Sequence, residues 1–270
     1  MKLWVVGSGS RGNAVLLECD GSRVLVDAGF PPRVLAQRLG AIGVPCESVE
    51  AVVITHDHAD HVRGASAAAK RWGWALYATA GTVAACPALA DADTRSFEPG
   101  GCLTLSRMDI RTVGIPHDAA EPVAVVATAH GSGVRAAIAY DLGHVPASVR
   151  GALIRADLLV MEANHDEGML RAGPYPPSVQ HRIGGTRGHL SNRAAAGAVR
   201  EALHRDLAHV VLAHLSDRCN DAALAHHAVA SALRGNRFRG TLHVSPQDAI
   251  IGPFTPWVRR APAARQLELF

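Results

Sequence analysis

The sequence predicts an α/β fold in which two β-sheets pack face to face and helices cover their outer surfaces. Three observations predict it. Short apolar runs rich in β-branched residues recur in both halves of the chain, and segments with helical apolar spacing separate them. In addition, 48% of the 270 residues are hydrophobic, which is enough to bury a full core.

The first half begins with a predicted meander of strands separated by Gly- and Ser-rich turns. These strands are expected at residues 2–6, 14–18 and 23–27. A helix is expected over residues 31–42, where apolar residues follow helical spacing after a Pro-Pro start. Residues 51–55 are apolar and β-branched, which is typical of a buried strand. An Ala-rich helix is expected over residues 62–72.

The second half also consists of strands punctuated by helices. Strands are expected at residues 110–115, 123–128, 134–140, 158–162, 210–213, 241–244 and 249–251. Helices are expected at residues 191–203, with a Ser or Asn cap, and at residues 222–233. From residue 255 the chain is rich in Pro, Ala and Arg, so we expect one domain over 1–254 and a flexible tail over 255–270.

Composition excludes several classes of protein. No apolar stretch is long enough to cross a membrane, and the apolar run at the start ends at Gly7, which is too early for a signal peptide. We therefore expect a cytoplasmic protein without a membrane partner. The five cysteines lack C-x-x-C spacing, which argues against a disulfide framework or a thiolate zinc site. The net charge of +3 does not by itself indicate nucleic-acid binding.

Four candidate metal ligands occur within six residues, directly after the predicted strand at 51–55. They are His56, His58, Asp60 and His61. In an extended loop His56 and His58 point to the same side, and the other two begin a helix from which they can turn toward the same pocket. Imidazole and carboxylate are ligands that Zn²⁺ or Mn²⁺ prefers. Chance would produce this pattern in roughly one such chain in several hundred, so it predicts a metal centre.

This cluster and four other motifs resemble the metallo-β-lactamase superfamily, whose fold is a four-layer αβ/βα sandwich with metals at one edge between two sheets. The other matching residues are Asp27 in VDAG, His117 in IPHD, Asp141 in YDLG and His214 in LAHLS. The resemblance implies that Asp27 steadies the ligand loop from outside.

The resemblance also implies a ligand set for two divalent ions, Zn²⁺ or Mn²⁺. One ion would be held by His56, His58 and His117, the other by Asp60, His61 and His214, and Asp141 would bridge them. Two such ions lie about 3.5–4 Å apart and lower the pKa of a shared water toward neutrality. A bridging hydroxide would then be the nucleophile.

Further segments suggest a substrate that carries phosphate. Ser8 lies in the turn GSGSRGN, which could cradle an anion or could be an ordinary hairpin turn. His165 follows a predicted strand, and His189, Ser191 and Asn192 open a predicted helix, whose N-terminus favours phosphate. Ser191 could equally be an N-cap. Nearby His181, Arg182 and Arg187 are also suited to phosphate.

In order along the chain, these motifs resemble the WalJ/YycJ group of the superfamily. They are GSGSRGN, THDHADH, PHDAAEPV, EANHD, GPYPPSVQHRI, GHLSN and LAHLSDRCN. The resemblance implies a DNA exonuclease that degrades strands from the 5′ end with Mn²⁺ or a similar ion. Metal-activated hydroxide would attack a phosphodiester in line, and either Asp60 or His189 would protonate the leaving group. Tyr140 replaces the usual Thr before Asp141 without altering the ligand.

The last five residues, QLELF, resemble the peptide by which bacterial DNA-processing proteins dock on the replication sliding clamp. The contacts expected there come from Gln266, Leu267, Leu269 and Phe270. The alternative is a chain end whose apolar residues pack back on the domain.

Two other functions are consistent with the sequence. A thioesterase of the glyoxalase II kind would need no phosphate-binding residues near His189. A non-catalytic DNA or clamp adaptor with a relic metal site would keep its binding after loss of Asp60 and His61.

Overall fold

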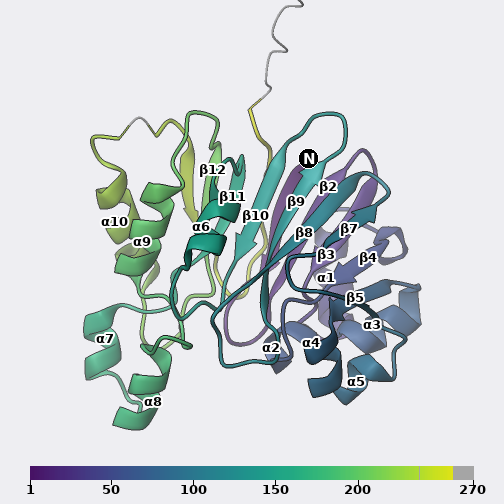
Figure 1. Cartoon of the computed structure of the whole chain (residues 1–270), viewed down its shortest axis with the longest axis horizontal. Coiled ribbons are helices and arrows are strands. Elements are labelled where there is room, and N and C mark those ends of the chain that lie inside the picture. Colours follow the sequence, from purple (N-terminus) through teal and green to yellow (C-terminus); the bar gives the residue numbers. More distant parts are fainter. Residues whose placement is uncertain (237, 258–270) are drawn as a thin grey trace, which may run out of the picture.

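The computed structural model of the chain describes residues 1–236 and 238–257. Within these residues the strands form two seven-stranded sheets packed face to face, with helices on both outer sides (Figure 1). The predicted α/β sandwich is therefore confirmed. In spatial order the first sheet contains β14 (Ile251–Phe254), β1 (Lys2–Gly7), β2 (Ala14–Cys19), β3 (Ser22–Val26), β4 (Ala51–Val53), β5 (Ala75–Thr79) and β6 (Arg95–Phe97). The second contains β13 (Thr241–Val244), β12 (His209–Ala213), β11 (Leu158–Glu162), β10 (Arg135–Ala139), β9 (Val123–Ala129), β8 (Met108–Gly114) and β7 (Cys102–Leu105).

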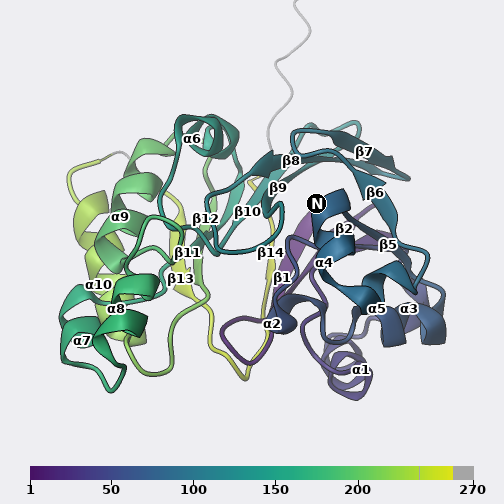
Figure 2. The same ribbon diagram turned by 60° about the horizontal axis from the view of Figure 1, so that its bottom comes forward.

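The helices divide between the two halves of the molecule (Figure 2). Beside the first sheet lie α1 (Pro32–Ala41), α2 (Ala59–Val62), α3 (Ala65–Trp72), α4 (Ala80–Ala85) and α5 (Pro87–Ala90), together with a 3₁₀ turn at Cys46–Ser48. Beside the second lie α6 (Ala147–Leu153), α7 (Glu167–Ala172), α8 (Pro177–Ile183), α9 (Asn192–Glu201) and α10 (Ala222–Leu233). Among the described residues no helix is long and apolar enough to cross a membrane.

Each sheet is buried on both faces, which explains why its strands read as continuous apolar runs. In β2, Val15 and Leu17 belong to the core between the sheets. Leu16 between them packs on the other face, in the core that includes Leu35 and Leu39 of α1. A third core lies between the second sheet and its helices, with Val199 of α9 among its members.

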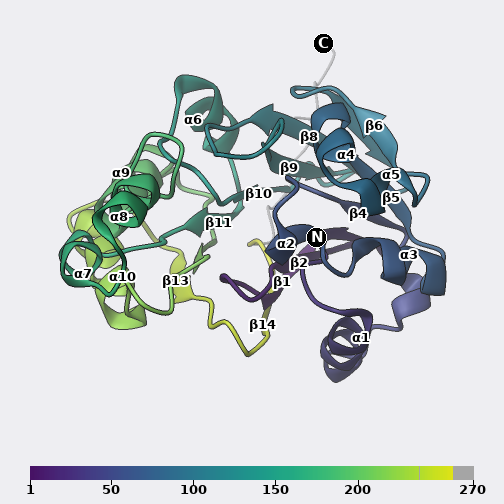
Figure 3. The same ribbon diagram turned by 90° about the horizontal axis from the view of Figure 1, so that it is seen from below.

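The carboxyl ends of parallel strands from both sheets lie at one edge of the sandwich. In the first sheet β3 pairs with β4 in parallel, and in the second β11 pairs in parallel with both β10 and β12. The short helix α2 lies at this edge, between the helices of the two halves (Figure 3). Open α/β sheets bind ligands beyond the carboxyl ends of their strands, so the topology places the chemistry here.

The structure differs from the expected elements in several places. The helix expected over 62–72 is divided into α2 and α3 at Gly64, whose N–H donates to the Ala28 carbonyl at 2.8 Å. The last strand is β14 instead of residues 249–251, because Phe254 pairs with Leu3 of β1. Strands β5, β6 and β7 and helices α4 to α8 were not expected, since these segments are short. The QLELF peptide lies outside the described residues.

We predict that Gly29→Ala destabilises the fold, because the added Cβ would meet the backbone carbonyl of Asp60 and lie 2.8 Å from the Asn13 nitrogen. Overpacking of this kind costs about 1–3 kcal/mol. Gly40→Ala is the matched control: it lies in α1 with open space around it and should add about 0.5–1 kcal/mol of stability. Urea denaturation measures both, and an unchanged midpoint for Gly29→Ala would contradict the prediction.

Candidate metal centre

Histidine and carboxylate side chains from both sheets converge at this edge. In each of several groups the candidate ligand atoms lie within 4.8 Å of one another. One group is His56, His58 and His117; a second is Asp60, His61 and His214; a third is His56, His61 and Asp141. The structure thus brings together all seven residues expected to hold metal. Asp141 shares a group with one histidine from each trio, so it lies between them.

A buried carboxylate, Asp27, connects four segments around the site. Its Oδ1 accepts the Thr55 backbone N–H at 2.7 Å, and its Oδ2 accepts the Thr55 hydroxyl at 2.8 Å. The same Oδ2 lies 2.7 Å from His61 Nδ1 and accepts the Tyr140 hydroxyl at 2.7 Å. The ends of β3, β4 and β10 and the start of α2 are therefore tied to one side chain. This is the place that the sequence analysis expected for Asp27.

Hydrogen bonds fix which nitrogen of each central histidine remains free. Because the Thr55 hydroxyl donates to Asp27, it accepts from His56 Nδ1, 3.0 Å away. His61 Nδ1 donates to the Asp27 carboxylate, so its Nε2 is the nitrogen available to a metal, and it faces Asp60 Oδ2 at 3.4 Å. In both rings the outer nitrogen is the donor, which leaves the inner nitrogen as a metal ligand.

The other histidines are oriented in the same way. His117 Nδ1 lies 3.1 Å from the Gly188 carbonyl and donates to it, so its Nε2 carries the lone pair and faces His58 Nδ1 at 3.3 Å. His214 Nδ1 lies 3.1 Å from Glu162 Oε1, and its Nε2 lies 3.4 Å from Asp60 Oδ2.

The donor set fits divalent metal ions. Among the described residues, buried His56 Nε2 has no hydrogen-bond partner, and buried Asp141 Oδ2 has only the Nε2 of His61, 3.0 Å away, which is itself a candidate ligand atom. A buried polar atom without a partner is costly, and a cation would satisfy both. Burial, followed by the charge of His61, holds the pKa of His56 well below its usual range, so His56 is in the neutral form that binds metal. Nitrogen and oxygen ligands without thiolate suit Zn²⁺ or Mn²⁺.

Glu162 is a site residue that the sequence analysis missed. It is fully buried at the end of β11, and its Oε1 accepts from His189 Nδ1 at 2.8 Å and from His214 Nδ1 at 3.1 Å. Its Oε2 accepts the backbone N–H groups of Leu142 and Leu190. Burial favours the neutral acid, but the charge of His189 and these bonds hold the pKa of Glu162 at about 2. A charged residue that ends an apolar run was the signal available in the sequence.

Asn13 was also missed. It is fully buried, and its side-chain amide lies 3.1 Å from Asp60 Oδ2 and 3.1 Å from His61 Nε2. Its backbone N–H donates to the Asp60 carbonyl at 2.7 Å. The Gly- and Ser-rich turn after β1 therefore supports the segment that carries Asp60 and His61.

Three site residues adopt left-handed backbone conformations, with φ of 62° at Asp27, 59° at Asp141 and 55° at His214. Such a conformation costs a non-glycine residue of order 1–3 kcal/mol and persists where surrounding contacts impose it. Asp27 directly follows the last residue of β3, and His214 directly follows the last residue of β12. Asp141 lies two residues after the last residue of β10. The sharp bend turns the side chain from the strand direction into the centre.

A cavity of about 190 Å³ opens onto these ligands. It is lined by Ser10, His58, Asp60, Asp141, Asn164, Tyr175, Arg182, Ile183, His189, His214 and Ser216. Among the residues expected to contact substrate, His189 lines this cavity. Arg182, which the sequence analysis considered suited to phosphate, also lines it.

The other four residues expected to contact substrate have different partners. The Ser8 hydroxyl donates to Asn13 and accepts the His214 backbone N–H, so it links two loops. Ser191 caps α9, as its alternative interpretation expected. Asn192 exchanges two hydrogen bonds with Asn220, and His165 is buried beside Ser191. Their placement does not support direct contact with substrate.

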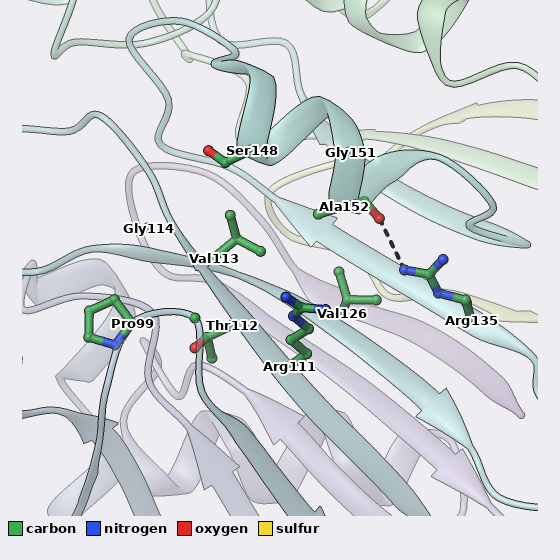
Figure 4. Close-up of a pocket in the computed structure, with 11 residues that line it drawn as sticks. Pro99, Arg111, Thr112, Val113, Gly114, Val126, Arg135, Ser148, Gly151 and Ala152 are labelled. Carbon is green, nitrogen blue, oxygen red and sulfur yellow. Dashed lines mark hydrogen bonds between the residues drawn. The ribbon is translucent and has the colours of Figure 1, made fainter.

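A larger cavity, of about 590 Å³, lies away from the histidines, between α6 and strands β8 and β9 (Figure 4). Val113 and Val126 contribute apolar side chains to its lining. Arg135, at its rim, donates hydrogen bonds to the carbonyls of Ala152 and Ile154 and so ties β10 to the end of α6. Among the described residues, no candidate metal ligand lines this larger cavity, and volume alone does not identify the functional site.

Comparisons with known proteins agree with this geometry. Residues 7–161 match the family model of the metallo-beta-lactamase superfamily. The chain is 32% identical over 238 residues to exodeoxyribonuclease YycJ of Bacillus anthracis, covering 87% of this chain and 89% of the relative. It is 33% identical to exodeoxyribonuclease WalJ of Streptococcus pneumoniae serotype 2, covering 86% and 88%. The solved structure of the metallo-beta-lactamase fold protein YhfI from Bacillus subtilis superposes with a TM-score of 0.69 at 20% identity, covering 93% of this chain and 98% of that one.

We predict that Glu162→Gln weakens metal binding by about 10- to 100-fold, because the amide has one acceptor oxygen and its NH2 group must face either the two histidines or the N–H groups of Leu142 and Leu190. Competition with a chelator measures the affinity for Mn²⁺ or Zn²⁺. Glu201→Gln, on the exposed surface of α9, is the matched control and should bind metal as the unchanged chain does. Equal affinities for the two variants would show that Glu162 does not orient ligands.

Proposed function

The chain belongs to the metallo-beta-lactamase superfamily, and we propose that it is a two-metal phosphodiesterase that degrades DNA strands from the 5′ end. The observation that carries the proposal is the set of histidines whose outer nitrogens are held by protein groups and whose inner nitrogens face one another and the carboxylates of the centre. The DNA substrate is supported by the similarity to YycJ and WalJ over most of the chain. The direction of degradation rests on resemblance to that group.

Two metal ions would be Zn²⁺ or Mn²⁺, held by the seven ligands already described. When bound, such ions lower the pKa of a water toward neutrality and stabilise charge on phosphoryl oxygens. Asp141, between the two trios, would contact both ions.

His189 is the better of the two candidate proton donors. Its Nδ1 donates to Glu162, and this hydrogen bond orients the imidazole ring. The ring lines the cavity, in which a leaving oxygen would lie. Both residues lie in groups of candidate ligand atoms, but Asp60 also has Asn13, His61 and His214 around its carboxylate. We therefore assign proton donation to His189 and metal binding to Asp60.

We predict that the purified chain shortens 5′-phosphorylated, end-labelled single-stranded DNA stepwise in Mn²⁺. The Asp60→Ala/His61→Ala variant should release no nucleotide, because it lacks two of the three ligands in one trio. A matched double variant, His226→Ala/His227→Ala, removes two exposed residues of α10 and should digest normally. Chelation should stop the reaction, and added Mn²⁺ should restore it.

A thioester substrate measured alongside distinguishes the main alternative. If DNA stays intact while the thioester is cleaved in a metal-dependent way, the centre is catalytic and the proposed substrate is wrong. If the double ligand variant digests DNA as fast as the unchanged chain, the proposed centre is not the catalytic one.

We also propose that residues 255–270 form a tail whose Gln266–Phe270 peptide docks on the bacterial sliding clamp. The support is the sequence QLELF alone, since residues 258–270 lie outside the described structure. The full chain should be retained by purified clamp, whereas a chain lacking residues 266–270 should not. Both should digest free DNA equally. Equal retention would overturn the proposed docking.

A further inference from the structure

A second cavity, of about 200 Å³, adjoins the metal cavity and has a different character. It is lined by Asp118, Tyr175, Val179, Arg182, Ile183, Gly188 and His189. Tyr175, Arg182, Ile183 and His189 line both cavities, so the two are immediate neighbours. We propose that this second cavity binds the nucleobase next to the scissile phosphate, which rests on the proposed nuclease function.

Helix α8 forms one side of this cavity and contributes nothing to the buried cores. None of its residues is buried, although Val179 and Ile183 are apolar and half-buried. The helix projects from the sandwich beside α7, at the edge where α2 lies (Figure 1). Since Val179 and Ile183 line the cavity, they offer an apolar surface at the entrance to the metal centre. An apolar surface at this position suits the face of a base.

The backbone of Tyr175 is restrained beside the cavity that its side chain lines. Two prolines follow it directly, and proline restricts the backbone on both sides of the bond. The Gln180 side chain donates to the Tyr175 carbonyl at 2.8 Å. An aromatic ring on a restrained backbone can stack on a base, and it accepts any base because every base has a π-face. An exonuclease that moves along a strand needs this tolerance.

Arg182 supplies the charge that a nucleotide requires. Its Nε donates to Asp118 Oδ2 at 2.6 Å, and its side chain is 69% exposed. This bond uses one of the five guanidinium N–H donors, so others remain for a phosphate. Asp118 directly follows the candidate ligand His117, so the Arg182 bond links α8 to the segment that carries His117. A base beside Tyr175 would thus have a cation for its phosphate, and the metal centre would lie in the neighbouring cavity.

A cavity that binds a nucleobase restricts the substrates to a narrower class than all phosphodiesters. It requires a base on a nucleotide that flanks the cleaved bond, so a strand without that base should be a poor substrate. Tyr175→Ala should lower kcat/KM on ordinary single-stranded DNA by about 5- to 100-fold, which is the contribution of one stacked base. Tyr175→Phe keeps the ring and should remain close to the unchanged chain.

The test compares an ordinary 5′-phosphorylated oligonucleotide with two others, each with one abasic site on one side of the first phosphodiester. With one of these two abasic substrates, kcat/KM of the unchanged chain should fall by the same factor that Tyr175→Ala causes on the ordinary oligonucleotide. On that abasic substrate, Tyr175→Ala should cause no further loss. If Tyr175→Ala lowers all three substrates equally, or lowers none, the base-binding role is overturned while the nuclease stands. If the unchanged chain digests no DNA, the proposed function fails and this inference with it.

Discussion

The buried carboxylate of Asp27 is the contact on which the arrangement of the centre depends. It accepts four hydrogen bonds from Thr55, His61 and Tyr140, so three strand ends and α2 meet at one side chain. A buried charge is tolerated when hydrogen bonds replace its water. Those bonds are also what orient the ligands: they fix the His61 ring directly and the His56 ring through Thr55. The first sheet therefore presents its ligands only in the folded arrangement that stabilises Asp27.

Glu162 has the corresponding role in the second sheet. It accepts from His189 and His214 and from two backbone N–H groups, and so it orients one candidate ligand and one candidate proton donor together. Two buried acids, one at a strand end in each sheet, thus turn the inner histidine nitrogens toward a shared space. The parallel strands of each sheet carry their part of the centre at their carboxyl ends. A small displacement between the sheets would therefore separate the two halves of the centre. The core between the sheets keeps them in register.

The sequence predicted the parts of this arrangement that are local in the chain. His56, His58, Asp60 and His61 were found because four ligands lie within six residues, and strands such as β4 and β11 were found because they are buried on both faces. Asn13, Glu162 and the Gly188 carbonyl were missed because each acts on residues at least 27 positions away. Ser8 was assigned to substrate because a Gly- and Ser-rich turn could cradle an anion, and its hydrogen bond with the His214 backbone N–H could not be predicted from spacing. Such contacts depend on tertiary packing, which spacing along the chain does not report.

The most direct test of this account is anomalous diffraction at the manganese absorption edge from crystals of the full chain grown with Mn²⁺. The account predicts two peaks about 3.5–4 Å apart, with Asp141 contacting both. One peak should be bounded by His56, His58 and His117, and the other by Asp60, His61 and His214. A single peak, or ions bound away from these residues, would contradict the two-metal centre.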